Sequence, residues 1–501
     1  MSTAAAKIEV KRFNNFIGGE WVAPSTGNYA PNRSPANTDD IVGEYPSSGQ
    51  KDAQDAIAAA KAAFPEWSGM PGPARGRILW KAVDIFRQRL DEIARTLCRE
   101  EGKTFTEAKG EVMKGINLFE FYSGEGFRTH GRTMPSETRS QFTYTLRQPY
   151  GVVALITPWN FPFAIPAWKS APALVTGNCV VMKPASNTPA TATLIAEVLQ
   201  QAGLPKGVFN LVTGPGGAVG NTLVDSPEVK VISFTGSNDI GIALNVRAAK
   251  RGAKVTAEMG GKNPVVVLDD ADLELAIPGI LNGAYGSTGQ RCTATSRVVV
   301  QKGVSAQVIE RLVAGAKKLK VGNGLESGID MGPAVDESQL KTDVDYIEIG
   351  KSEGAKLLCG GRRLTDGALA KGYYFEPAVF AGVKPGMRLH QEEIFGPVIS
   401  VVEVGDFEEA LYAANHVDFG LSASIYTRDA NTAMKFIERS EVGMVHVNNP
   451  TVGGEAQLPF GGWKSTGVGE REMAEEGAEF FTQLKTVFFD YTGAVRTSKI
   501  Y

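Results

Sequence analysis

The fold is decided by residues 178–252, which read NCVVMKPAS (178–186), TATLIAEVLQQAG (191–203), VFNLVTG (208–214), AVGNTLVDS (218–226), KVISFTGS (230–237) and DIGIALNVRAAKRG (239–252). Short runs rich in β-branched residues alternate here with runs of helical periodicity. That alternation is typical of βαβ units, whose strands form a parallel sheet. The stretch therefore predicts an α/β fold.

A second series of strands and helices follows the first. KNPVVVLDDAD (262–272) leads into a helix that we expect at 276–289, and SRVVVQ (296–301) leads into a helical run at 304–319. The valine-rich runs in both segments have the composition of strands in a parallel sheet covered on two faces. We therefore expect a second α/β unit after the first.

The flanking segments predict helices before these units and a strand after them. Apolar periodicity indicates helices at 51–64 and 105–123 and one long helix over 74–102, with Gly102 as its C-cap. From residue 478 to the end, β-branched and aromatic residues indicate a strand and not a helix. An isolated late strand of this kind often pairs with a partner subunit.

Composition and charge exclude several classes of protein. The 501 residues are 43% apolar and 21% charged, close to the globular average. A net charge of −3 gives no bulk attraction to nucleic acid or to an anionic membrane. Residues 1–15 lack the apolar core of a signal peptide, and no stretch reaches the ~18 apolar residues of a membrane span. We expect a cytoplasmic protein.

The four cysteines lie far apart, without the spacing of a zinc site or a disulfide framework, so no metal site is predicted. Cys98 in a helical run and Cys179 at a strand start have the positions of core residues, and nothing around Cys359 suggests catalysis. Cys292 lies in the loop GQRC before a strand, where the adjacent Arg291 could favour the thiolate, the nucleophilic form. A buried packing cysteine is the alternative.

Two strand ends are candidate cofactor sites. FTGSNDIG (234–241) leads from a strand through Gly236 into a helix, whose free N–H groups and positive end suit a pyrophosphate. Its glycine spacing is not that of the dinucleotide fingerprint, so a connection without a ligand stays open. In VVMKPAS (180–186), the ammonium of Lys183 could reach ribose hydroxyls or phosphate, or could simply extend to solvent.

Two other strand ends carry candidate catalytic groups. The proline-rich loop TPWNFPF (157–163) holds Asn160, whose amide has the two donors that an oxyanion hole needs, although asparagine is also an ordinary turn residue. In TAEMGGKNP (256–264), Glu258 ends a strand before two glycines. Near an apolar cleft its pKa would rise and it could act as a general base; a solvated loop glutamate is the alternative.

Seven motifs follow one another along the chain: PWNFP, the Lys-Pro-Ala-Ser run, FTGS-x-x-IG, E-M-GGKNP, GQRC, EEIFGPV and PFGG-x-K-S. In this order and with these gaps they resemble the aldehyde dehydrogenase superfamily, from about Phe16 to Val487. The resemblance implies a Rossmann-like cofactor domain, an α/β catalytic domain and a small β extension for oligomerisation.

The resemblance also implies a role for each candidate residue. Cys292 would attack the aldehyde carbon, Asn160 and the backbone N–H of Cys292 would hold the oxyanion, and Glu258 would activate the water that hydrolyses the thioester. Glu472 resembles a glutamate on a proton or water path, with one extra residue in 467–477. The implied cofactor residues are Thr157, Trp159, Lys183, Ser186, Gly236, Ser237, Gly241, Glu393 and Phe395. The implied substrate pocket is lined by Phe161, Trp168, Arg291 and Phe460.

Ser186 bears on the choice of cofactor. Strict NAD⁺ users of the family commonly have a glutamate three residues after the lysine, where it binds the ribose 2′-hydroxyl and repels a 2′-phosphate. Serine removes that repulsion, so NADP⁺ should be accepted beside NAD⁺.

Two features bear on the substrate. The Arg-Cys pair followed by TATSR resembles the subgroup that oxidises 2-oxoglutarate semialdehyde, and the Lys-Pro-Ala-Ser run resembles succinate-semialdehyde dehydrogenases. Both favour a semialdehyde with a distal carboxylate. Aromatic residues such as Trp159 and Phe163, and a loop at 449–458 that carries Glu455 rather than an arginine, fit simple aliphatic or aromatic aldehydes at least as well.

Three rival functions are disfavoured by residues that are present or absent. A CoA-acylating relative would generally lack the base at Glu258, and a catalytically silent, crystallin-like protein could have lost Cys292. A cysteine hydrolase would need a histidine close to Cys292. None of the four histidines lies in a recognisable Cys/His motif: His130, His390, His416 and His446.

We expect three modules. The cofactor-binding domain comprises 1–129, 150–258 and 466–479, the catalytic domain 259–465, and the oligomerisation strands 130–149 and 480–501. The resemblance implies a homodimer or homotetramer, in which the two oligomerisation strands meet across a subunit interface. The expected partner is a small aldehyde, with no nucleic acid and no membrane.

Overall fold

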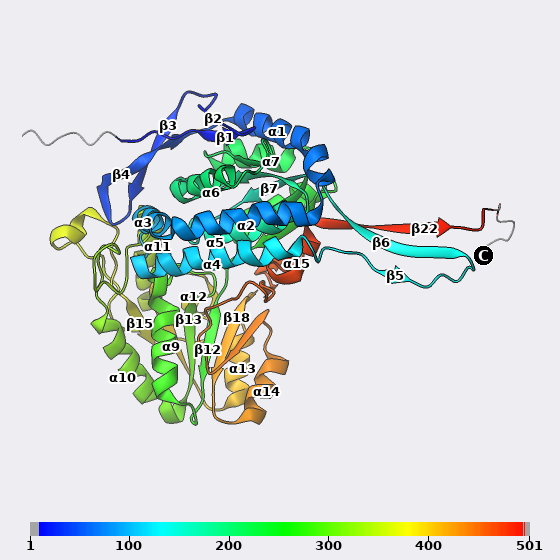
Figure 1. The fold of residues 1–501 in the computed structure, drawn as a ribbon. Helices are drawn as coiled ribbons and strands as arrows, with labels where there is room; N and C mark the ends of the chain where they lie inside the picture. The colour runs from blue at the N-terminus through cyan, green and yellow to red at the C-terminus, as the bar shows by residue number, and fades with distance from the viewer. Residues whose placement is uncertain (1–9, 494, 496–501) are drawn as a thin grey trace, which may run out of the picture.

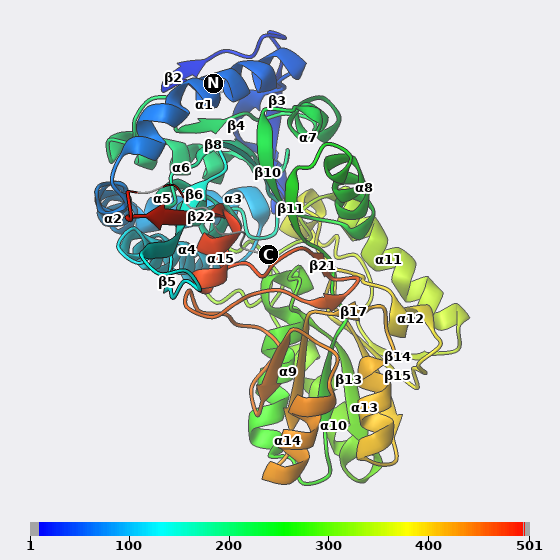
Figure 2. The same ribbon diagram turned by 90° about the vertical axis from the view of Figure 1, so that its right-hand side faces the viewer.

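The structure, a computed structural model, describes residues 10–493 and 495. Two layers of sheet and helix lie one above the other, and a β arm projects from their side (Figure 1). Figure 2 shows the same two layers from the arm side, with β10 and β11 in the upper layer and β13 in the lower one. The predicted α/β fold is confirmed.

The upper sheet has eight strands in the order β2-β1-β9-β8-β7-β10-β11-β21. Its central strands are parallel, as the alternation of strands and helices predicted. Strand β7 is almost wholly buried because helices cover both faces of the sheet. The strands are β1 (Asn15–Ile17), β2 (Glu20–Val22), β7 (Val152–Ile156), β8 (Cys179–Lys183), β9 (Phe209–Leu211), β10 (Val229–Thr235), β11 (Lys254–Glu258) and β21 (Gly467–Val468).

The helices of the upper layer correct one prediction. The single helix predicted over 74–102 is two helices, because Arg89 between them has the non-helical angles φ −98° and ψ 11°. Both helices bury an apolar face, so their periodicity continues across the break and conceals it. The helices are α1 (Gln50–Gly69), α2 (Gly72–Gln88), α3 (Leu90–Glu101), α4 (Phe105–Glu125), α5 (Ala164–Val175), α6 (Pro189–Gln201), α7 (Asn221–Asp225) and α8 (Asn238–Ala249).

Helix α4 has a well-defined start. Thr104 accepts a hydrogen bond from the N–H of Glu107, and the Glu107 carboxylate accepts one from the N–H of Thr104. This reciprocal capping box satisfies two backbone donors at the helix end. Gly102, the predicted C-cap of α3, has the left-handed φ of 102° that favours glycine.

The lower sheet has seven strands in the order β14-β15-β16-β13-β12-β18-β19, with only the β14–β15 pair antiparallel. Val265 and Val267 pack on one face and Val266 on the other, as the period of two in a strand requires. The strands are β12 (Asn263–Val267), β13 (Thr295–Gln301), β14 (Lys356–Cys359), β15 (Ala378–Ala381), β16 (Val398–Val404), β18 (Ser422–Tyr426) and β19 (Met444–Val447).

Helices α9 and α10 cover one face of the lower sheet, and α11, α13 and α14 cover the other. The helix predicted at 276–289 ends at Tyr285, because Ser287 and Thr288 have positive φ values of 49° and 59° that an α-helix cannot hold. The helices are α9 (Leu273–Tyr285), α10 (Lys302–Lys318), α11 (Glu337–Ser352), α12 (Arg388–Gln391), α13 (Phe407–Asn415) and α14 (Ala430–Arg439).

The arm consists of β5 (Thr133–Met134), β6 (Gln141–Pro149) and β22 (Thr482–Asp490). Strand β22 pairs antiparallel with β6 of the same chain, so no second subunit is needed to complete the pair, contrary to expectation. Residues 478–480, predicted as strand, end helix α15 (Ala474–Phe480). The last part of the predicted tail strand, 494 and 496–501, lies outside the described residues.

Small elements complete the chain. Two short sheets pair β3 with β4 and β17 with β20. The elements are β3 (Tyr29–Ser34), β4 (Asn37–Pro46), β17 (Phe419–Gly420), β20 (Trp463–Lys464), the π-helical turn Gly216–Gly220, and the 3₁₀ turns Gly286–Gly289 and Gly367–Lys371.

Candidate active site

A cavity of about 230 Å³ lies where β7, β10 and β11 end and the chain passes to the lower sheet. In open α/β sheets, ligands bind at the carboxyl ends of the strands. Many of the predicted site residues line this one cavity. Its lining is Pro158, Trp159, Asn160, Ile165, Trp168, Thr235, Gly236, Ser237, Glu258, Met259, Gly260, Cys292, Glu393, Phe395 and Phe460.

A second cavity, of about 360 Å³, meets the first at Cys292, Trp168 and Phe460. The nucleophile candidate is therefore reached from two sides. All four predicted substrate-pocket residues line the second cavity. Its lining is Glu107, Gly110, Glu111, Lys114, Phe161, Trp168, Asn282, Ser287, Arg291, Cys292, Thr293, Pro450, Val452, Gly453, Gly454 and Phe460.

Cys292 is half-buried and follows the left-handed turn at Ser287 and Thr288. Hydrogen bonds hold its loop on both sides: Asn263 Nδ2 donates to the Cys292 carbonyl over 2.8 Å, and the N–H of Val335 donates to the Gln290 side chain over 2.9 Å. The thiol is thus presented from a fixed backbone.

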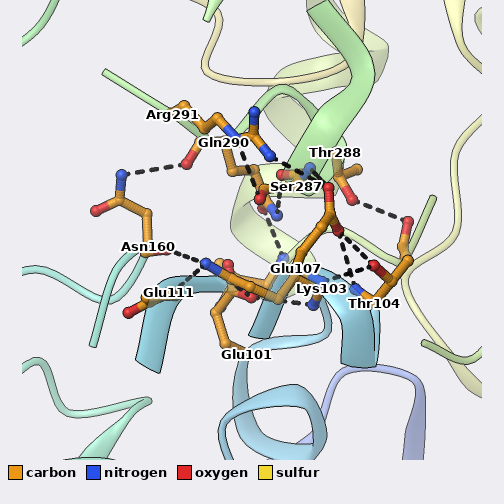
Figure 3. A network of polar contacts seen from close by, with 12 residues as sticks. Glu101, Lys103, Thr104, Glu107, Glu111, Asn160, Ser287, Thr288, Gln290 and Arg291 are labelled. Atoms are coloured by element: carbon orange, nitrogen blue, oxygen red, sulfur yellow. Dashed lines mark hydrogen bonds and ion pairs between the residues drawn. The ribbon is translucent and has the colours of Figure 1, made fainter. Parts of the chain in front are cut away.

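Burial raises the pKa of the Cys292 thiol to about 12, and the positive charge of Lys114 opposes this rise. The sequence had pointed to Arg291 as the favouring charge. Its guanidinium instead contacts the carboxylate of Glu107, with 3.2 Å between Nη2 and Oε1, and donates to the Ser287 hydroxyl (Figure 3). Lys114, which the sequence analysis did not single out, is the cation that acts on the thiol.

Asn160 is buried and is held from both ends (Figure 3). The side-chain Nδ2 of Asn160 donates to the Gln290 carbonyl over 3.1 Å, and the backbone carbonyl of Asn160 accepts from Lys103 Nζ over 2.7 Å. Lys103 is buried too, and its ammonium lies 2.6 Å from Glu111 Oε2 and 4.0 Å from the centre of the Phe161 ring. The amide therefore points at the backbone that precedes Cys292, with one donor still available.

Glu258 is buried at the end of β11, and its Oε2 atom has no hydrogen-bond partner among the described residues. Burial, and after it the negative charge of Glu472, raise the pKa of Glu258 well above its ordinary value. A carboxylate in this environment is a stronger base than a solvated one. The interpretation of Glu258 as a solvated loop glutamate is therefore wrong.

Glu472 lies in a buried cluster beside the cavity. Its carboxylate forms an ion pair with Lys169 and accepts hydrogen bonds from Trp168 Nε1 over 2.7 Å and from Ser233 Oγ over 2.9 Å. Because Glu472 raises the pKa of Glu258 and Lys169 lowers it, this pair adjusts the basicity of Glu258.

Some of the predicted cofactor residues line the first cavity, and others lie outside it. Trp159 and Phe395 stack edge to face with ring centres 5.3 Å apart, and Glu393 Oε1 accepts from the N–H of Gly261 over 2.9 Å. Burial raises the pKa of Glu393 to about 7. Gly241 does not line the cavity; a Cβ there would lie 2.5 Å from Met259 Sδ, so this glycine allows α8 to pack closely.

Lys183, the last residue of β8, and Ser186, three residues beyond it, lie outside the first cavity. The Lys183 ammonium is buried and donates to the Pro184 carbonyl over 2.8 Å, and burial lowers its pKa to about 8. Ser186 is exposed and donates to the Gly214 carbonyl over 3.1 Å. The hydroxyls of Thr157 and Thr235 are buried without a partner among the described residues, as groups that await a polar ligand would be.

The described residues offer neither a metal site nor a membrane-spanning helix. Across residues 10–493 and 495, no group of three or more His, Cys, Asp or Glu side chains is placed to hold a metal ion. In the same part of the chain, no helix has the length and apolar character needed to cross a membrane.

Two layers of mostly parallel sheet, with a cysteine and a buried carboxylate between them, define a class: dehydrogenases that work through a cysteine thioester. The chain belongs to the aldehyde dehydrogenase family, whose model matches residues 21–487, and it is an NAD(P)-dependent aldehyde dehydrogenase. The resemblance inferred from the motifs is confirmed.

Individual relatives agree with this assignment. The chain is 47% identical to the alpha-ketoglutaric semialdehyde dehydrogenase of Bacillus subtilis, over 96% of this chain and 98% of that protein. It is 45% identical to the alpha-ketoglutarate semialdehyde dehydrogenase of Haloferax volcanii, over 95% and 99%. A crystal structure of betaine aldehyde dehydrogenase from Staphylococcus aureus, in complex with NAD⁺, superposes with a TM-score of 0.94 at 33% identity and covers 96% of this chain and 95% of that one.

Proposed function

We propose that this enzyme oxidises a semialdehyde with a distal carboxylate, such as 2-oxoglutarate semialdehyde, to the dicarboxylic acid. The observation that carries the proposal is the position of Cys292 between two cavities. One cavity contains Glu258, and the other contains the ammonium of Lys114, which has no ion-pair partner among the described residues. The relatives from Bacillus subtilis and Haloferax volcanii, named for this substrate, support it.

The first chemical step is attack by Cys292 on the aldehyde carbon. The thiolate is the attacking form, and the charge of Lys114 favours it. The oxygen of the thiohemiacetal becomes negative and is held by the free donor of Asn160 and by the backbone N–H of Cys292. Donors already fixed in place cost no reorganisation when the charge develops. For Asn160, the contact from Lys103 supplies that fixation.

The strand ends in and beside the first cavity carry polar groups suited to a dinucleotide. The unpartnered hydroxyls of Thr157 and Thr235, the ammonium of Lys183 and the Glu393 carboxylate are polar groups of the kind that bind ribose and phosphate. When bound, the nicotinamide accepts the hydride that leaves the thiohemiacetal carbon. Trp159 and Phe395 form an aromatic wall beside Cys292 that limits access of water at this stage.

Hydrolysis is the second half of the reaction. Glu258 removes a proton from water, the resulting hydroxide attacks the thioester, and Cys292 leaves as thiolate. A buried carboxylate with a raised pKa suits this role because it binds the proton firmly enough to activate water. The presence of this base favours water over CoA as the acceptor.

We also propose that NADP⁺ is used beside NAD⁺. Ser186 is exposed and brings no negative charge to the place where a 2′-phosphate would lie. Lys183, three residues earlier at the end of β8, would supply a positive charge to the same dinucleotide. The structure of the betaine aldehyde dehydrogenase with NAD⁺ supports use of a nicotinamide dinucleotide and leaves the preference to experiment.

The arm suggests a homo-oligomer. It carries large apolar side chains that are strongly exposed in the single chain: Phe142, Leu146, Leu484, Phe488 and Phe489. They lie on both faces of the β6–β22 pair, since Phe489 is opposite Phe142 and Phe488 is opposite Thr143. Large apolar side chains exposed together on a projecting arm usually mark a protein–protein interface. We assign 130–149 and 480–501 to the oligomerisation module, 1–129, 150–258 and 466–479 to cofactor binding, and 259–465 to catalysis.

The direct test is oxidation by the full-length chain without CoA. The enzyme is mixed with 2-oxoglutarate semialdehyde and either NADP⁺ or NAD⁺, and both reduced nicotinamide and 2-oxoglutarate are measured. Equal amounts of the two products are expected. Formation of reduced nicotinamide only when CoA is present would contradict the hydrolytic mechanism, and turnover of neutral aldehydes alone would contradict the substrate class.

A further inference from the structure

Four charged side chains line the second cavity: Glu107, Glu111, Lys114 and Arg291. Glu111 is fully engaged inside the protein, since its carboxylate lies 2.6 Å from Lys103 Nζ and accepts from the N–H of Phe163 over 2.9 Å. Its charge is therefore neutralised before any ligand enters.

Glu107 is engaged as well. Its carboxylate accepts hydrogen bonds from the N–H of Ser287 over 2.6 Å and from the N–H of Thr104 over 3.0 Å. It also contacts Arg291, which donates to Glu107 and to the Ser287 hydroxyl, each over 3.2 Å. Most of the five N–H donors of Arg291 thus have no partner among the described residues. The carboxylates of the cavity thus have internal partners, and cationic donors remain.

Lys114 differs from the other three. Among the described residues, none forms an ion pair or a hydrogen bond with its ammonium, which lies 5.3 Å from the centre of the Trp168 ring. It interacts electrostatically with Cys292, so it lies within reach of the reacting end of a substrate. The glycine at position 454 leaves space beside the Lys114 ammonium, because a Cβ atom there would lie 3.3 Å from Lys114 Nζ.

We propose that Lys114, assisted by Arg291, binds the distal carboxylate of the substrate while its aldehyde group lies at Cys292. A half-buried ammonium with no ion-pair partner among the described residues gains a strong charge-assisted contact from a carboxylate and gains nothing from a methyl group. Glu111 acts on it only through space, because its carboxylate is paired with Lys103. The same charge repels a trimethylammonium group, so it also excludes betaine aldehyde. The aromatic side chains of Phe161, Trp168 and Phe460 enclose the apolar part of the chain between the two ends. This inference rests on the proposed function and names the residues that give it its substrate class.

The test compares two aldehydes of equal length, glutarate semialdehyde and pentanal, which differ in a carboxylate against a methyl group. In Lys114→Gln, kcat/KM for glutarate semialdehyde is expected to fall about 10- to 100-fold, mostly through KM, as loss of a charge-assisted contact requires. The value for pentanal falls only by the part that Lys114 contributes through the Cys292 thiolate, so it falls less than the value for glutarate semialdehyde. Lys114→Arg is expected to restore most of the preference. Arg291→Lys is expected to lower the preference by a smaller factor.

Lys109 provides the matched control. It lies on the same helix as Lys114 but forms an exposed ion pair with Asp91, outside both cavities, so Lys109→Gln should leave the preference unchanged. The wild-type enzyme gives a measurement that needs no variant. Glutarate should compete with pentanal at lower concentration than pentanoate does.

The outcomes separate this inference from the proposed function. If the wild-type enzyme shows no preference for glutarate semialdehyde over pentanal, the proposed substrate class is wrong and the role of Lys114 is wrong with it. If the wild-type preference is strong but Lys114→Gln keeps it, only the assignment of Lys114 is wrong. An equal loss for both aldehydes would also overturn the assignment, because Lys114 would then act through the thiolate alone. Glutarate inhibition no stronger than pentanoate inhibition would overturn it too.

Discussion

Replacing Lys103 with methionine removes the side chain that holds the backbone of Asn160. The Lys103 ammonium is buried, with Glu111 Oε2 at 2.6 Å, the Asn160 carbonyl at 2.7 Å and Glu101 at 3.8 Å. Methionine fills a similar volume but leaves the Glu111 carboxylate buried without its counterion. Breaking a buried pair in this way costs about 3–5 kcal/mol of folding free energy. A misplaced Asn160 amide should lower kcat on the order of 100-fold, since displacement by about 1 Å can have that effect.

Urea unfolding, followed by tryptophan fluorescence, measures the loss of folding free energy. Steady-state oxidation of the aldehyde measures kcat. Lys51→Met is the control, because Lys51 forms a 2.7 Å ion pair with Asp55 on the exposed face of α1 and such pairs contribute about 0–1 kcal/mol. If the free energy of unfolding of Lys103→Met lies within about 1 kcal/mol of the wild-type value and its kcat is unchanged, the role given to Lys103 is refuted.

Two further predictions concern the base and the cofactor. Glu258 must be deprotonated to activate water, so kcat should rise with pH through its raised pKa. Glu472→Gln removes a charge that raises this pKa and should move the rise to lower pH; a profile that stays in place or moves to higher pH would contradict the coupling. Ser186→Glu should lower kcat/KM for NADP⁺ relative to NAD⁺ by about 10-fold or more, since a carboxylate facing a phosphate is a like-charge pair that costs several kcal/mol. An unchanged ratio, measured from initial rates with both cofactors, would show that Ser186 does not discriminate between them.

The parallel sheets and most strand ends could be predicted because the information is local. Runs such as VVMK in β8 and KVTAE in β11 show both the strand and the side chain at its end. The break at Arg89 could not be predicted, because both helices keep the same apolar periodicity. The left-handed turn at Ser287 and Thr288 was missed for another reason: neither residue is a type that favours positive φ.

The residues of the candidate site also fall into two groups, those that could be predicted from the sequence and those that could not. Glu258 ends a strand, Asn160 lies in a loop after a strand, and Cys292 follows a glycine-containing loop, so all three are marked in the sequence. Lys114 and Lys103 do not, because they lie on or near helix α4 and their importance depends on what packs against them. The sequence cannot show which positive charge acts on Cys292, because that depends on distances in the folded structure. Adjacency in the sequence suggested Arg291, and the contact with Glu107 explains why that suggestion was wrong.

The central claim is that Cys292 carries the acyl group and that Glu258 is needed to release it. Glu258→Gln, mixed with 2-oxoglutarate semialdehyde and NADP⁺, tests it by mass spectrometry of the rapidly quenched protein. We expect about one equivalent of reduced nicotinamide and an acyl group that accumulates on the peptide containing Cys292, followed by very slow turnover. An unmodified Cys292 peptide alongside wild-type turnover, or an acyl group on any other residue, would contradict the account.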